Sequence, residues 1–163
     1  DITLSEGSAV ATKVVGDYIY RDAASKAVMR AGRHYVQFTV VSGSGIYFGV
    51  IQPGWDVEGE NHAEDDIHIE DIVDGHCFYY TFNGHRYPGK HDWEGKQYAM
   101  EGDRIGMLLD LDQGSMTVYK NDERLGVMAT GLSGEYSWAV SLLWQGDSVR
   151  IGADEAPAPP TTG

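Results

Sequence analysis

Short runs of alternating apolar and polar residues are the feature of this sequence that most restricts its fold. The clearest runs are residues 34–41, 104–111 and 136–144. A repeat of two places every second side chain on the same face of an extended strand. No long segment carries the helical spacing of apolar residues. The runs therefore predict strands, with these apolar faces: Val36, Phe38 and Val40; Ile105, Met107, Leu109 and Leu111; Trp138, Val140, Leu142 and Trp144.

Turn-forming residues separate these runs at short intervals. Gly43-Ser44-Gly45 and Asp112-Gln113-Gly114 each stand between two strand candidates, and Asn121-Asp122 uses residue types that tolerate the left-handed backbone region. Many short strands with regular turn signals are typical of a sandwich or barrel. The sequence therefore predicts an all-β fold, an antiparallel β-sandwich with little or no helix. The other strand candidates are residues 46–51, 77–82, 115–120, 124–128 and 148–151.

The chain is long enough for one domain with a full hydrophobic core. Its length is 163 residues, and a domain near that size buries roughly 68–70% of its unfolded surface. We expect one sandwich domain over residues 1–152, in which residues 1–31 supply opening strands from 10–15 and 18–20. Residues 153–163 are rich in proline and are expected to form a tail or linker. Because position 1 is Asp rather than Met, we expect a domain of a larger multidomain protein.

Charge and cysteine usage limit the classes of partner. Asp and Glu number 25 against 12 Lys and Arg, for a net charge of −13. Such a field repels nucleic-acid phosphates and anionic membranes, so the expected partner is a neutral or basic protein or peptide. No apolar run is long enough to span a bilayer. The lone Cys77 cannot form an internal disulfide, which favours an intracellular location, cytoplasmic or nuclear.

Residues 56–74 form a strongly acidic segment. They include nine acidic residues and no Lys or Arg. We interpret the segment as a long exposed loop. Two roles stay open at this point: a loop that attracts a basic partner, and a solvated surface with no partner.

Motifs for catalysis, cofactors or metals are weak in this sequence. It has no G-x-S-x-G, no H-E-x-x-H and no glycine-rich phosphate loop. We therefore expect no enzyme, no catalytic residue, no cofactor and no metal site. The open alternatives are a zinc site at His62, His68 and His76, and a cation at Asp110 and Asp112, which we instead interpret as turn caps.

Five motifs in fixed order carry a resemblance to a known family. Residues 102–112 read GDRIGMLLDLD, which is similar to the motif GD-x-IG-x-x-LD-x-D of SPRY (B30.2-like) domains. Residues 114–126, 131–141, 32–38 and 48–50 resemble further SPRY motifs, and the resemblance covers about residues 32–152. The sequence departs from the family at Asp122, where glycine is usual, and at Val36, where tryptophan is frequent.

The resemblance implies a concanavalin-like or jelly-roll-like sandwich that binds other proteins through its loops. SPRY domains that bind peptides use an early loop with an arginine, a mid-chain aromatic residue and a strand-end tripeptide. The alternatives are a lectin-like carbohydrate-binding domain and a structural docking domain, and Trp144 could instead belong to the core. The resemblance assigns the partner-binding site to Arg21, Asp22, Tyr47, Trp55, Leu143, Trp144 and Gln145.

Overall fold

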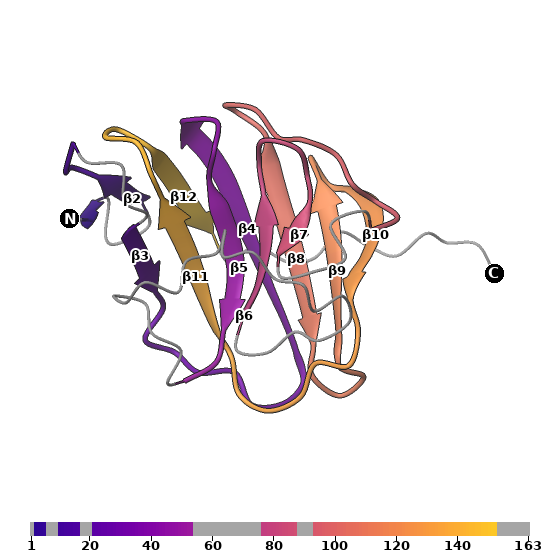
Figure 1. The fold of residues 1–163 in the computed structure, drawn as a ribbon. Coiled ribbons are helices and arrows are strands. Elements are labelled where there is room, and N and C mark those ends of the chain that lie inside the picture. Colours follow the sequence, from indigo (N-terminus) through magenta and orange to yellow (C-terminus); the bar gives the residue numbers. More distant parts are fainter. Residues whose placement is uncertain (1, 6–9, 17–20, 54–75, 88–92, 153–163) are drawn as a thin grey trace.

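The computed structural model describes residues 2–5, 10–16, 21–53, 76–87 and 93–152, which form two antiparallel sheets and no helix (Figure 1). The all-β sandwich prediction is thus confirmed. One sheet has seven strands, in the order β1 (Ile2–Ser5), β2 (Val10–Lys13), β12 (Ser148–Gly152), β4 (Arg33–Ser42), β8 (Arg104–Asp110), β9 (Ser115–Lys120) and β10 (Glu123–Ala129). The other has five, in the order β3 (Arg21–Ala24), β11 (Ser137–Leu142), β5 (Tyr47–Ile51), β6 (His76–Tyr80) and β7 (Arg86–Tyr87).

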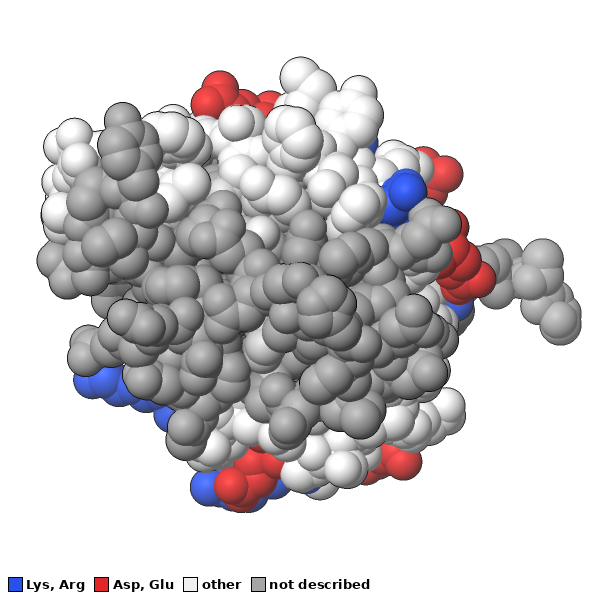
Figure 2. Space-filling view, in the orientation of Figure 1, with Lys and Arg blue, Asp and Glu red and all other residues white. Residues whose placement is uncertain are grey.

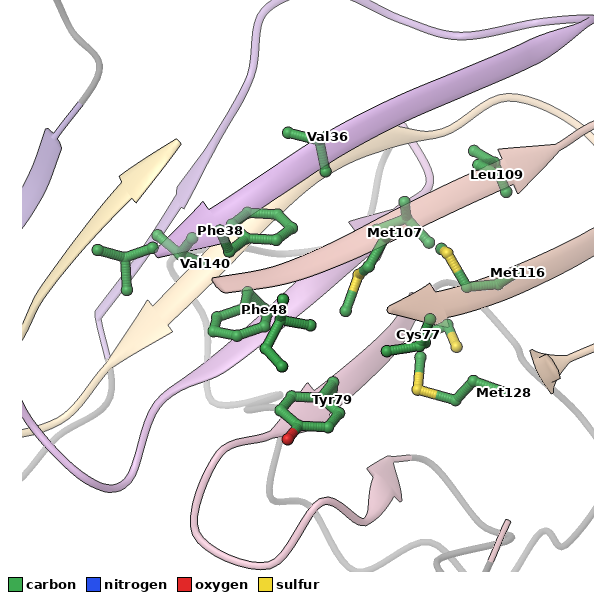
Figure 3. Packing of buried hydrophobic residues seen from close by; sticks show 14 of the residues in the cluster. Val36, Phe38, Phe48, Cys77, Tyr79, Met107, Leu109, Met116, Met128 and Val140 are labelled. Carbon is green, nitrogen blue, oxygen red and sulfur yellow. The ribbon is translucent and has the colours of Figure 1, made fainter. Parts of the chain in front are cut away.

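The alternating apolar faces of both sheets meet in the core. Phe38 of β4 stacks on Phe48 of β5 with ring centroids 4.5 Å apart, and both side chains are fully buried. Met107 and Leu109 of β8 lie in the same cluster (Figure 3). The period-two pattern therefore marks the side chains that the two sheets bury against each other.

Cys77 is part of this core. Its thiol is buried beside Met107, Met116 and Met128 in the cluster (Figure 3). Burial raises the pKa of the Cys77 thiol to about 12. The thiol is therefore protonated at neutral pH, as expected for an inert core cysteine.

Three of the strands were not predicted, and two apolar residues were placed on strands that end before them. β3 and β7 carry no alternating apolar pattern, and the alternation of β1, which reads ITLS, covers only four residues. β8 ends at Asp110 and β11 at Leu142, so Leu111 and Trp144 follow their strands. The expected strand at residues 18–20 lies outside the described residues.

Two of the predicted turns form hairpins, between β8 and β9 and between β9 and β10. Asn121 and Asp122 join β9 to β10 with φ angles of 51° and 73°, which confirms the left-handed backbone expected there. The carboxylate of Asp110 accepts the N–H groups of Asp112 and Gln113, each at 3.0 Å, as expected of a turn cap. Over the part of the chain that the structure describes, no three His, Cys, Asp or Glu side chains gather as metal ligands. His62 and His68 of the proposed zinc site lie outside that part.

No stretch of helix that could cross a membrane occurs in the described ranges.

Candidate interaction surface

Strand register brings three of the predicted segments to the same end of the sandwich. Leu142, the last residue of β11, pairs with Arg21 of β3. Ser141 pairs with Asp22 of β3 on one side and with Tyr47 of β5 on the other. The turn at Leu143–Asp147 follows directly. This end, at the top of Figure 1, we call the loop end.

Two buried charged residues hold the turn that carries Trp144 by hydrogen bonds to its backbone. Lys13 has no exposed surface, and Asp147 is 3% exposed. The Asp147 carboxylate accepts the N–H groups of Leu143 at 3.2 Å and Trp144 at 2.8 Å. The Lys13 ammonium donates to the carbonyl of Leu143. These bonds satisfy backbone groups of the turn that are partly shielded from water.

Backbone hydrogen bonds complete this support. The N–H of Asp147 donates to the carbonyl of Trp144 at 2.9 Å, which closes a tight turn. Gly146 adopts a φ of 95°, and its N–H donates to the carbonyl of Lys13 at 2.8 Å. The turn is thus tied to the end of β2 as well as to its own strand.

Burial governs the electrostatics of Asp147. Desolvation raises the pKa of its carboxyl group, although the N–H groups of Trp144 and Leu143 and the charge of Lys13 act to lower it. Gly43 packs directly against this carboxylate, and a Cβ atom at Gly43 would clash with Oδ1 of Asp147. The loop between β4 and β5 therefore packs against the turn at Leu143–Asp147, and this contact further restricts the movement of the turn.

The side chains of the turn point in different directions. Trp144 is 48% exposed, which confirms the prediction of a partly exposed indole and not a core tryptophan. Leu143 packs against the outer cluster of the five-stranded sheet, which includes Tyr47. The Gln145 side chain is exposed and donates to the carbonyl of Val14 at 3.2 Å. A rigid turn thus presents one large aromatic surface to solvent.

The other predicted residues have different settings. Tyr47 is only 2% exposed and stacks on Tyr80 at 4.2 Å, so it supports the surface from beneath. Arg21 and Asp22 were expected in a loop, which is wrong, because pairing with β11 places them in β3. Trp55 lies outside the described residues.

Sequence reasoning missed most of the exposed apolar surface at the loop end. The described residues expose seven large apolar side chains, and all except Leu4 lie beside strand ends at this end. In Figure 2 the upper margin is mostly white, with acidic atoms at one place. The signal in the sequence was apolar residues in the segments between strands, with Val41 of β4 as the exception. We call these residues the apolar rim: Val14, Val41, Phe82, Tyr98, Met100 and Trp144.

A cavity of about 560 Å³ lies apart from the predicted site. It opens between the two sheets, and its lining includes Val36, Trp138, Val140 and Ile151. Of the predicted partner-binding residues that the structure describes, none is among those that line it. The cavity is therefore separate from the loop end, and the two features are independent of each other.

Comparisons with known proteins agree with this architecture. The structure is similar to the SPRY domain of human HERC1, with a TM-score of 0.72 and 18% identity, over 94% of this chain and 93% of that one. A human SPRY domain gives a TM-score of 0.66 and 16% identity, over 94% and 96% of the two chains. The TRIM65 PSpry domain gives 0.72 and 15%, over 94% and 84%.

At these identities the structural matches show a shared fold. A search of curated protein sequences found no match. The family itself is shown by the sequence model for the SPRY domain, which matches residues 33–155. This range begins at the first residue of β4 and contains the GDRIGMLLDLD motif of β8 and the strand that leads to Trp144. The chain therefore belongs to the SPRY domain family.

Proposed function

We propose that this SPRY domain is a non-catalytic module that binds a peptide or protein segment at the loop end. The observation that carries the proposal is the exposure of Trp144 on a turn held by buried Lys13 and Asp147. Tryptophan is enriched among residues that dominate binding energy. A rigid setting reduces the entropy that is lost when a partner immobilises the side chain.

The charge of the chain supports a protein partner that is neutral or basic. A net charge of −13 disfavours nucleic acids and anionic lipids, whose binding depends on Lys and Arg. It favours encounter with a partner that carries positive charge. We further propose that the module is one part of a larger protein, as the similar SPRY domains of HERC1 and TRIM65 are. We also propose an intracellular location, in keeping with its single, buried Cys77.

A pull-down compared with a glycan array would test this proposal. We expect the wild-type chain to capture a protein partner that Trp144→Ala captures poorly, and to bind no glycan. Binding of a glycan that depends on Trp144 would support the lectin-like alternative. Equal capture by wild type and Trp144→Ala would move the binding site away from the loop end.

The docking-domain alternative predicts a different result. In that case the loop end contacts another part of the parent protein, so the domain would bind a separately expressed segment of that protein. The dissociation constant of the purified domain and that segment, measured for wild type and for Trp144→Ala, tests this alternative. Tight binding that depends on Trp144 would support it.

A further inference from the structure

The apolar rim contains a second apolar area beside the one formed by Trp144. Phe82 follows β6 and is 66% exposed, and Met100 precedes β8 and is 58% exposed. The N–H of Ala99 donates to the carbonyl of Thr81 at 2.8 Å, so these two exposed residues are neighbours in space. We call Phe82 and Met100 the second apolar area.

The ring of Phe82 packs on other aromatic side chains. Its ring lies 6.0 Å from that of Tyr80, which in turn stacks on the buried Tyr47. Exposed apolar side chains that are gathered in this way, and not scattered singly, mark interaction sites. Phe82 therefore has the same arrangement as Trp144: an exposed aromatic ring above a buried, packed support.

A carboxylate lies between the two areas. Glu101 follows Met100 in the chain, and its side chain accepts the N–H of Gly43 at 3.0 Å. Gly43 in turn packs against Asp147, which holds the N–H of Trp144. Glu101 is thus connected on one side to the second apolar area and on the other to the turn of Trp144.

Three of the described cations at this end have other partners. Lys13 donates to the Leu143 carbonyl. Arg104 pairs with Asp122 at 3.0 Å, and Lys120 lies 3.8 Å from Asp103. Within the residues that the structure describes, no Lys or Arg forms an ion pair with Glu101. Its negative charge is available to a cation from outside the chain.

Strand order gives the distance between the two areas. β11 and β6 both neighbour β5, so their ends lie two strand spacings apart, about 10 Å. Trp144 and Phe82 each follow the end of one of these strands. An extended chain advances roughly 3.3–3.6 Å per residue, so about three residues span the gap.

We propose that the loop end binds an extended partner segment in which two apolar side chains, about three positions apart, flank a Lys or Arg. One apolar side chain contacts Trp144, the other contacts Phe82 and Met100, and the cation pairs with Glu101. This inference rests on the proposed function and adds to it the chemistry of the partner.

Selection from a displayed library of short random peptides tests the inference. We expect the purified chain to enrich peptides with an apolar, basic, apolar pattern. Phe82→Ser and Glu101→Gln should each weaken binding of a selected peptide by about tenfold. Glu101→Gln keeps an oxygen that can accept the Gly43 N–H, so it removes the charge and preserves the contact. Leu4→Ser is the matched control, since Leu4 is 54% exposed but lies outside the apolar rim.

A double-mutant cycle identifies the ion pair. Replacing the basic residue of the selected peptide by Gln should abolish the effect of Glu101→Gln. Enriched peptides without a basic residue, or wild-type affinity in Phe82→Ser and Glu101→Gln, would overturn the inference. If Trp144→Ala still lost binding in that case, the proposed function would stand. If Trp144→Ala also bound the peptide as wild type does, both the inference and the proposed function would be overturned. A library that yields no binding peptide would overturn the proposal of an extended partner segment.

Discussion

Two tryptophans near the same strand have different settings because of where the strand ends. Trp138 lies within β11, packs against the core and meets the ring of Phe38 edge to face at 6.1 Å. Trp144 lies two residues beyond the strand and is 48% exposed. The same alternating pattern contains both residues, so position along the strand decides which side chain packs on the core and which is exposed.

The first prediction concerns stability. Trp138→Ala removes a large side chain from beside the core and should lower the free energy of unfolding by about 3 kcal/mol. Trp144→Ala removes a half-exposed side chain and should lower it by less than about 1 kcal/mol. Urea denaturation of both variants measures the difference. A larger loss in Trp144→Ala than in Trp138→Ala would contradict these roles.

The second prediction concerns acid stability. The N–H of Gln113 lowers the pKa of Asp110 below its ordinary value of 3.8, and the N–H of Asp112 and the charge of Arg33 act in the same direction. Because the folded pKa is lower than the unfolded one, Asp110 stabilises the fold above the unfolded pKa. This contribution is lost as the pH falls through the folded pKa.

Asp110→Asn should therefore be less stable than wild type near neutral pH, and the difference should shrink below pH 3.8. Unfolding curves at a series of pH values measure it. Asp112→Asn in the same turn is the control and should cost less at every pH, since that side chain accepts one N–H, from Gly32. A difference that stays constant with pH would show that Asp110 acts through packing alone.

At the scale of elements, the turn from β9 to β10 shows how side chains stabilise a left-handed backbone. Asn121 has a φ of 51°, its Oδ1 accepts the N–H of Arg104 at 2.9 Å, and its Nδ2 donates to Asp103 at 3.1 Å. The third prediction is that Asn121→Ala lowers the free energy of unfolding by about 1–3 kcal/mol, through strain and lost hydrogen bonds.

Asn121→Gly separates these two causes. Glycine adopts positive φ readily, so this variant loses the hydrogen bonds and avoids the strain. It should be more stable than Asn121→Ala, as measured by thermal unfolding. Equal stabilities would mean that backbone strain contributes nothing at this turn.

The strands that could be predicted are those with one face in the core. β4, β8 and β11 bury alternate apolar side chains, so the pattern follows directly from the sandwich. β3 could not be predicted, because Arg-Asp-Ala-Ala has no apolar face, and its strand geometry comes from pairing with β11 at the sheet edge. β7 has only two residues, too few for any periodic signal.

The candidate site could be predicted only in part, for a similar reason. Trp144 could be nominated because it ends an alternating run and because the family resemblance assigns it to the site. Phe82 and Met100 come from segments far away in sequence, and only the fold brings them to the loop end. No local sequence pattern shows that these two turns are close in space. The second apolar area could therefore be identified only from the structure.

At the scale of the whole molecule, net charge should affect how fast a partner binds. Residues 56–74 lie outside the described residues but carry nine of the 25 acidic residues. The fourth prediction is that Glu64→Gln, Asp65→Asn and Asp66→Asn together slow association with a basic peptide and weaken its dependence on salt. Stopped-flow kinetics at several ionic strengths measures both. An unchanged rate and salt slope would indicate that the segment only solvates the surface.

The measurement that tests the central proposal most directly is the affinity of Trp144→Ala for an identified partner, made together with its melting temperature. We expect the dissociation constant to rise at least about tenfold while the melting temperature changes little, because the indole contacts the partner and not the core. Leu4→Ala, exposed outside the apolar rim, should leave the affinity unchanged. Normal affinity in Trp144→Ala, or a loss of affinity that follows from unfolding, would contradict the account.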